Sequence, residues 1–265
     1  MKENMFPVNK IVTHAGQFHA DEVFAIGLLR CVFPHTKFKV ERKRTVDPED
    51  TTDKCITIDV GHNYDPVLLN FDHHQDETLE SSNMLILDFL YSQGYIKEGF
   101  YKDLFGPFSW ISKIDRGGFG KNTQGFQTNS LIKAFNYVEN GFDLAVNLAT
   151  EYCKGLKGST EMYESSKDIW KNRTMVNKGV AVLSTHPLRW RKDAEAGVAY
   201  IVFPEPENNT WKVNSFNSAY FPIESTGEEK FLHNQKFIGV YYSKESAIKA
   251  AVISYEKHAK LTIAM

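Results

Sequence analysis

Apolar and polar positions in the first half of the chain form short runs typical of strands and a longer run typical of a helix. The predicted strands are residues 10–13, 38–42, 55–60 and 68–71. Residues 20–33 are apolar on nearly every face and are followed by Pro34, which predicts a buried helix. Strand and helix in alternation predict an α/β fold, a mainly parallel sheet with helices on both faces.

The second half of the chain predicts a long helix and then a smaller domain. Ser81 and Ser82 are suited to begin a helix that runs to about Gln93. Residues 100–138 are typical of helices with loops at Gly117, Gly118 and Gly120, and residues 142–172 of one long helix. After these come predicted strands at 178–184, 199–203, 211–216 and 237–242, and a closing helix at 243–258. We therefore expect domains at 1–140 and 177–265, the second a smaller α/β domain, joined by a connecting helix within 141–176.

Composition and charge narrow the class of protein. The chain has 265 residues, 42% of them hydrophobic and 24% charged, which is ample for a packed core. A formal net charge of -2 gives no overall positive field, although a local basic groove remains compatible with it. Three scattered cysteines, no recognisable leader and no apolar run long enough to span a bilayer predict a cytoplasmic protein without a membrane partner.

Potential metal ligands occur at four places that each end a predicted strand or lie on a helix. The segments are His14-Ala-Gly-Gln-Phe-His19-Ala-Asp21, then Ile58-Asp59-Val60-Gly61, then Asp72-His73-His74, then Ile114-Asp115. Because ligands of α/β sheets gather at the carboxyl ends of the strands, these side chains are expected to meet there. Each motif alone is also typical of a turn or a helix cap; four together favour a site.

The residue types favour two divalent ions. We expect His14 and His19 on the first ion, with Asp59 bridging to a second one, since a lone acid at the end of a buried strand needs a partner. The expected ligands of the second ion are Asp21, His73 and Asp115. Three carboxylates against two dications leave about one positive charge, which attracts phosphate. Imidazole-rich ligation disfavours magnesium and suits manganese, and equally cobalt, iron or zinc; of these we expect manganese.

These motifs resemble the DHH phosphoesterase superfamily, and most closely its melanocyte-proliferating-gene (MYG) branch of predicted exonucleases. The residues that carry the resemblance are 13–22, Asp59 to Gly61, Tyr64-Asp65, Phe71 to Gln75, Ser81-Ser82 and Ile114-Asp115. The resemblance implies a metal-dependent catalytic domain in 1–140, a substrate-binding domain in 177–265 and a cleft between them. It implies that His73 binds metal, that His74 contacts substrate or the bridging water, and that Asp72 orients a ligand from behind.

Two departures from the family pattern concern substrate contacts. Arg116 follows Asp115 where the family has Asn, so it is a candidate to bind phosphate or a residue facing water. His233 matches a family histidine, but most of the glycines expected after it are missing, which puts phosphate binding by that loop in doubt. Arg189 and Arg191 flank Trp190 in a mixture typical of single-stranded nucleic-acid binding, or of a solvated edge anchored by one tryptophan.

Three functions remain in view. The first is a phosphodiester hydrolase, a 3′–5′ exonuclease on single-stranded RNA or DNA that uses two Mn²⁺ ions. The second is a phosphoesterase for dinucleotides, oligonucleotides or pyrophosphate. The third is a metal-binding regulatory protein without catalysis. The oligomeric state is not predicted.

Overall fold

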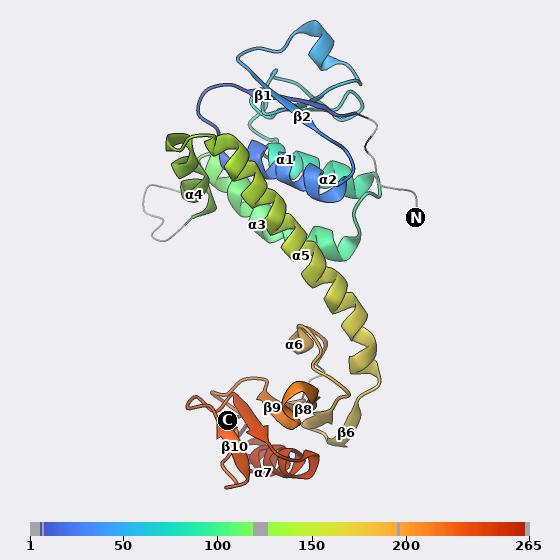
Figure 1. Cartoon of the computed structure of the whole chain (residues 1–265), viewed down its shortest axis with the longest axis vertical. Helices are drawn as coiled ribbons and strands as arrows, with labels where there is room; N and C mark the ends of the chain where they lie inside the picture. Colours follow the sequence, from blue (N-terminus) through green and yellow to red (C-terminus); the bar gives the residue numbers. More distant parts are fainter. Residues whose placement is uncertain (1–5, 7, 119–126, 195–196, 263–265) are drawn as a thin grey trace. The chain divides into compact units, whose positions relative to one another are not determined.

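Two compact units make up the chain. The computed structural model describes residues 6, 8–118, 127–194 and 197–262, and the units are Met1–Thr160 and Glu161–Met265. The helix α5 (Gly141–Lys171) spans the boundary between them (Figure 1). The long helix expected at 142–172 is therefore confirmed, while the catalytic and substrate-binding roles assigned to the two parts stay predictions.

A five-stranded sheet of order β2-β1-β3-β5-β4 forms the first unit. Its strands are β1 (Lys10–His14), β2 (Lys39–Lys43), β3 (Ile56–Ile58), β4 (Tyr64–Asp65) and β5 (Asn70–Phe71). β1 runs parallel to β2 and β3, and β3 runs parallel to β5, while β4 pairs antiparallel with β5. The sheet is thus mainly parallel, as expected, and the carboxyl ends of its four parallel strands lie at one edge.

The two faces of this sheet are covered differently. The helices α1 (Ala20–Val32), α2 (Ser82–Ser92) and α3 (Glu98–Asp115) pack together beneath one face and form the main core with residues such as Ile11 and Ile58 (Figure 1). On the other face, residues 44–55 contain the short 3-10 helix η1 (Pro48–Thr51). There the buried Asp50 pairs with Lys10 at 2.6 Å and with Lys43 at 2.5 Å. The α/β class is confirmed. The expectation of helices on both faces holds only in part, since within the described residues the second face carries only the short 3-10 helix η1.

The helix α1 is buried on nearly every side, including its acidic residues Asp21 and Glu22. Gly27 allows the close approach of α5, since a Cβ at this position would lie 2.7 Å from the Cβ of Ala149. Farther along, the segment 100–138 forms α3, α4 (Thr128–Ala134) and the 3-10 helix η2 (Phe135–Tyr137). Residues 119–126, including Gly120, lie outside the described residues.

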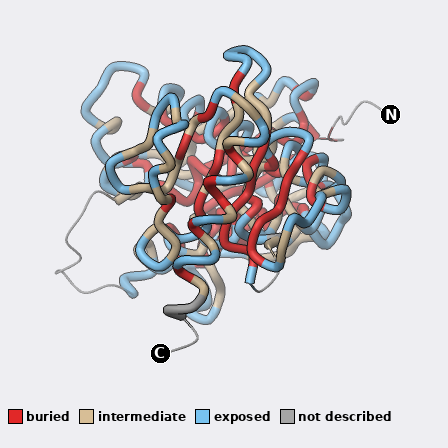
Figure 2. Tube along the Cα trace, turned by 90° about the horizontal axis from the view of Figure 1, so that it is seen from below, coloured by how far each residue is buried: buried red, intermediate tan, exposed pale blue. Residues whose placement is uncertain are grey.

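The second unit is a six-stranded sheet of order β10-β11-β9-β8-β7-β6. Its elements are β6 (Thr174–Asn177), β7 (Val180–Val182), α6 (Trp190–Asp193), β8 (Tyr200–Glu205), η3 (Pro206–Asn208), β9 (Thr210–Ser215), β10 (Glu229–Leu232), β11 (Ile238–Tyr241) and α7 (Lys244–Thr262). One core lies between the sheet and α7, and another contains Trp170 and Trp190. The short strands β4, β6 and β10 were not predicted. Buried positions gather in the interior, and exposed positions form the surrounding loops (Figure 2).

Candidate metal centre

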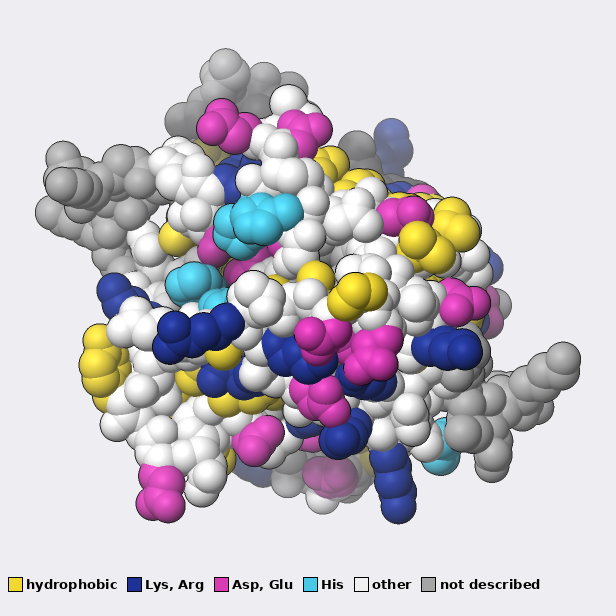
Figure 3. Space-filling view, turned by 90° about the horizontal axis from the view of Figure 1, so that it is seen from above, with side chains coloured by type: hydrophobic (Ala, Val, Ile, Leu, Met, Phe, Trp, Pro, Cys, Tyr) yellow, Lys and Arg dark blue, Asp and Glu magenta, His cyan; other side chains and the backbone are white. Residues whose placement is uncertain are grey.

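The edge where β1, β3 and β5 end brings three of the predicted motifs together. His14 ends β1, Asp59 follows β3 directly, and Asp72, His73 and His74 follow β5. The fourth motif arrives from the helical side, because Asp115 is the last residue of α3. Histidines and acidic side chains gather on this face of the molecule, beside a band of lysines and arginines (Figure 3).

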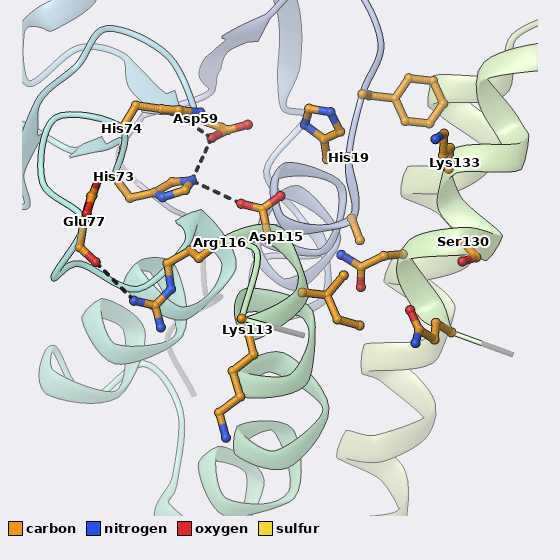
Figure 4. Close-up of a pocket in the computed structure, with 16 residues that line it drawn as sticks. His19, Asp59, His73, His74, Glu77, Lys113, Asp115, Arg116, Ser130 and Lys133 are labelled. Atoms are coloured by element: carbon orange, nitrogen blue, oxygen red, sulfur yellow. Dashed lines mark hydrogen bonds and ion pairs between the residues drawn. The ribbon is translucent and has the colours of Figure 1, made fainter. Parts of the chain in front are cut away.

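Asp59 lies at the centre of the cluster. Its Oδ2 is 3.4 Å from Nε2 of His14. Its Oδ1 is 3.4 Å from Nε2 of His73, a contact drawn in Figure 4. A left-handed backbone conformation at Asp59, with φ of 57°, is uncommon for a residue other than glycine. The two carboxylate oxygens therefore face different histidines, which is the geometry that a bridging carboxylate needs.

His73 lies among three acids. Its Nε2 is 3.4 Å from Asp115 Oδ2 and 3.9 Å from Asp21 Oδ2, in addition to the contact with Asp59. Burial lowers the pKa of His73, but Asp115 and Asp59 outweigh it and raise that pKa to about 10. Without a metal, the proton on His73 therefore offsets part of the surrounding negative charge, and a cation bound there would displace it.

Glu22 completes the other half of the cluster and was missed at the sequence level. Its Oε1 is 2.8 Å from Nε2 of His14, and both carboxylate oxygens accept the backbone N–H of His19. His14 and His19 stack with ring centroids 5.4 Å apart. An acid three residues after a helix N-cap is typical of capping, so nothing in the sequence indicates separately that Glu22 faces the histidines.

These ligand atoms form three overlapping groups, each within 4.8 Å. The groups are His14, His19, Glu22 and Asp59; then Asp59, His73 and His74; then His19, Asp21 and Asp115. All six predicted metal ligands thus lie in one cluster, with Glu22 in addition. Because Glu22 is a fourth carboxylate, two dications would be neutralised, not left with the net positive charge expected from three.

The buried acids of this cluster are costly without a cation. Burial, followed by repulsion from Asp59, raises the pKa of both Asp21 and Glu22 well above the usual range. Among the described residues, both oxygens of Asp21, Oδ1 of Asp59 and Nε2 of His73 are buried without a hydrogen-bond partner. Unpartnered buried acceptors around an imidazole fit a divalent transition metal, which would satisfy all of them.

Asp72 contacts His74, whereas the resemblance placed it behind a metal ligand. Its Oδ1 is 2.7 Å from Nδ1 of His74 and accepts the backbone N–H of His74, while Oδ2 accepts that of His62. These hydrogen bonds lower the pKa of Asp72 against the effect of burial, which raises it. A ring nitrogen that donates to Asp72 is not free to bind metal. The side chain of His74 is 51% exposed.

A cavity of about 1000 Å³ opens beside the cluster. His19, Asp59, His73 and Asp115 line one side, and Ser130 and Lys133 of α4 lie across from them (Figure 4). The lining also includes Lys113 and Arg116. The guanidinium of Arg116 pairs with Glu80 at 2.9 Å and donates to the carbonyl of Leu79, so the structure gives it protein partners as well as a place at the cavity.

The predicted substrate contacts of the second unit have structural partners. Arg191 donates to the carbonyls of Ser215 and Phe216, and the ring of Trp190 is 2% exposed, so it offers no face for base stacking. Arg189 lies over the ring of Tyr163. His233 accepts the backbone N–H of Gln235 and packs against Phe237. Roles for Arg189, Arg191 and His233 in substrate binding stay predictions.

The fold and the cluster define an α/β protein with a candidate metal centre at the carboxyl edge of a parallel sheet. The model of an uncharacterised protein family (MYG1_exonuc, UPF0160) matches residues 10–105. The chain is 28% identical to a MYG1 protein of Chlamydia trachomatis over 68% of this chain and 65% of that one. It is 40% identical to the MYG1 exonuclease of Homo sapiens over 29% of this chain and 20% of that one. The predicted resemblance to the MYG family is confirmed, and the family model matches residues 10–105 of this chain.

The chain spans less than two thirds of the length of these relatives. Among solved structures, RecJ from Thermus thermophilus in complex with Mn²⁺ covers 95% of this chain and 52% of its own, with a TM-score of 0.31 and 13% identity. An exopolyphosphatase-related protein from Bacteroides fragilis has a TM-score of 0.26 and 13% identity, over 95% of this chain and 92% of its own. Within the described part of the chain, no helix has the length and apolar character needed to cross a bilayer.

Proposed function

We propose that the chain is a metal-dependent phosphodiester hydrolase, and specifically a 3′–5′ exonuclease on single-stranded RNA or DNA. The observation that carries this proposal is Asp59, whose two carboxylate oxygens face His14 and His73 from the two halves of one buried cluster. The name of the human relative, MYG1 exonuclease, supports the nuclease class.

Seven side chains would hold two divalent ions. Asp59 would bridge, with His14, His19 and Glu22 on one side and Asp21, His73 and Asp115 on the other. When bound, the ions would supply Lewis acidity and an activated water for phosphate ester hydrolysis. The mixture of imidazole and carboxylate donors favours manganese over magnesium, and the Mn²⁺ in the RecJ complex is in keeping with that choice.

His74 is the candidate proton donor or substrate contact. Asp72 accepts its Nδ1–H, which leaves Nε2 as the ring nitrogen available to a substrate, and His74 lines the cavity. His74 would therefore act beside a bound phosphodiester, while Asp72 keeps its ring in place.

The far side of the cavity suits a sugar–phosphate chain. Lys133 and Ser130 face the cluster from α4, and Lys113 and Arg116 lie at its border (Figure 4). A cation there would contact a phosphate next to the one being cleaved, and the release of counterions from that phosphate would favour binding. Sequence reasoning missed Lys133 and Ser130, since α4 carries no motif.

The small-substrate alternative gains support from the same lining. Its described cations are Lys113, Arg116 and Lys133, and Arg116 is already paired with Glu80. Arg191 and Trp190, expected to grip a longer chain, are engaged within their own unit. A dinucleotide or short oligonucleotide needs fewer phosphate contacts and would be held by this cavity alone.

Hydrolysis of end-labelled single-stranded RNA and DNA, as 5-mers and 20-mers, tests the proposal in Mn²⁺ and in a chelator. We expect metal-dependent shortening from the 3′ end and no activity of Asp59→Asn. Turnover of a dinucleotide with longer chains untouched would favour the second function. Absence of hydrolysis by a protein that binds metal would leave the regulatory role.

A further inference from the structure

The loop that joins β1 to α1 positions two of the seven candidate ligands, His14 directly before it and His19 at its end. The loop is short, with His19 as the last of its residues 15–19, and Gly16 within it has a φ of 101°. The His19 imidazole is exposed. Its position is therefore set by the backbone that leads into it and by the capping contact of Glu22 with its N–H.

Asn136, in the 3-10 helix η2, binds that backbone from 118 residues away. Its Oδ1 accepts the N–H of Phe18 at 2.9 Å, and its Nδ2 donates to the carbonyl of Phe18, also at 2.9 Å. One side-chain amide thus satisfies both backbone groups of Phe18, as a neighbouring strand would. The remaining Nδ2 hydrogen points to the carbonyl of Lys133 at 3.3 Å.

The residues around Phe18 hold the loop in place next to Asn136. The ring of Phe18 is 4% exposed and packs edge-on against Phe142 at 5.4 Å. Arg42 donates to the carbonyl of Gly16 at 2.7 Å, and its guanidinium lies over the ring of Phe142 at 4.6 Å. The loop is therefore held on the side of Gly16 by Arg42 and, immediately before His19, by Asn136.

We propose that Asn136 is a positioning residue of the metal centre, which acts on His19 through the backbone of Phe18. This inference rests on the proposed metal centre. Loss of the amide leaves a buried N–H and a buried carbonyl of Phe18 without partners, so the backbone next to His19 must shift to reach water. His19 then no longer points at the ion that His14, Glu22 and Asp59 would hold.

The test is the affinity for Mn²⁺ alone, measured by titration of the whole chain at a temperature well below unfolding. Asn136→Ala is expected to weaken Mn²⁺ binding about 10–100-fold, the usual effect of removing a group that orients a metal ligand. Asn136→Asp keeps the acceptor and shape but loses the donor, and is expected to weaken binding in the same direction. If Asn136→Ala does not fold, this isosteric variant carries the test.

Asn147→Ala is the matched control. Asn147 also bonds across 117 residues, to Arg30 at 3.3 Å, but at the opposite end of α1 and in an exposed position. It should change Mn²⁺ affinity less than twofold. The visible spectrum of the Co²⁺-loaded protein gives a second measurement, because a lost or displaced imidazole changes the ligand field, whereas a merely structural role of Asn136 would leave it unchanged.

Two outcomes would overturn the inference and are distinguishable. An Asn136 variant that melts at a lower temperature, yet binds Mn²⁺ within twofold of the wild-type protein with an unchanged Co²⁺ spectrum, shows a structural role only. A wild-type protein that binds no Mn²⁺ removes the proposed metal centre itself, and this inference with it.

Discussion

Asp72 accepts a hydrogen bond from His74, with Oδ1 2.7 Å from Nδ1 of the imidazole. The same carboxylate is 1% exposed and binds two backbone N–H groups, so it is rigidly placed. A rigid acid behind an exposed imidazole is suited to proton transfer or substrate contact. The expected role of His74 therefore differs from that of His73, which lies among the acids of the candidate metal cluster. Two neighbouring histidines therefore have different expected effects on substitution.

The first prediction contrasts Asp59→Asn with His74→Ala. Asp59→Asn should abolish hydrolysis and lower the metal content, because both halves of the cluster use its carboxylate. His74→Ala should keep the metal and lower kcat by about 10²–10⁴-fold, the range of general acid–base catalysis. Elemental analysis and steady-state kinetics on the same preparations test this. If His74→Ala loses metal as fully as Asp59→Asn, His74 is a ligand and the separation is wrong.

The second prediction concerns Asp21, whose carboxylate is buried with both oxygens unpartnered within the described residues. Asp21→Asn should stabilise the metal-free protein by about 1–3 kcal/mol, because a neutral amide replaces a buried carboxyl group whose ionisation is unfavourable at that position. The same change should weaken Mn²⁺ binding, since the amide is a poorer ligand. Thermal melts with chelator and with Mn²⁺ measure both effects.

The second prediction is specific because Asp21→Asn should raise the melting temperature in chelator and reduce the stabilisation that Mn²⁺ gives. Asp103→Asn, on α3 but away from the cluster, is the matched control; Asp103 accepts a hydrogen bond from Thr160 at 2.6 Å. It should not stabilise the metal-free protein. A destabilised metal-free Asp21→Asn would mean that the buried carboxylate is satisfied in solution without a metal.

The meeting of the candidate ligands was largely predictable because its signals are local. His14 and Asp59 stand directly after short apolar runs, His73 stands two residues after the end of another, and parallel strands necessarily end at one edge. Glu22 was missed because an acid in the first turn of a helix has an ordinary explanation as a cap. Asn136 and Lys133 were out of reach for a different reason: their contacts are made by the folding of α4 and η2 onto the loop, across more than a hundred residues.

Strands without an amphipathic pattern could not be predicted from the sequence either. The strands β4 and β10 are short and lie at sheet edges, where half of the positions face water and no period survives. Trp190 and Arg191 formed a recognisable motif, but the motif was ambiguous. A basic residue beside an aromatic one occurs both where a protein binds nucleic acid and where the pair anchors a loop. Burial of the ring and the two carbonyl contacts of Arg191 were decided by tertiary packing.

The third prediction is a pH dependence that is independent of the metal. Burial raises the pKa of Asp50, but hydrogen bonds from Lys10 and Lys43 outweigh it and lower the pKa to about 2. The folded pKa is below the unfolded value of about 3.9. The stability that Asp50 contributes is therefore fully present above about pH 4 and is lost as the pH falls toward 2.

Asp50→Asn should accordingly lower the melting temperature at pH 7, and the difference from the wild-type protein should shrink between pH 4 and pH 2.5. Melts followed by circular dichroism in a chelator test this without any contribution from the metal cluster. Asp53→Asn, an exposed acid a few residues away, serves as the control. A difference that stays constant down to pH 2.5 would show that Asp50 acts through packing and not through its charge.

The last prediction distinguishes a long single strand from a small substrate. Lys133 faces the metal cluster across the cavity from α4, so a phosphate bound between them would neutralise it (Figure 4). Each phosphate contact releases counterions, and removing one should lower the slope of log affinity against log salt by about 1. Lys133→Gln is expected to show this loss on a single-stranded 20-mer.

The control for this prediction is Lys154→Gln, at an exposed lysine paired with Glu151 outside the cavity lining, which should leave the slope unchanged. Arg191→Ala, measured in parallel, should also lower the slope if the second unit contacts the strand. A shallow slope for the wild-type protein that neither substitution alters, together with rapid turnover of a dinucleotide, would exclude the extended contact and favour the small-substrate function.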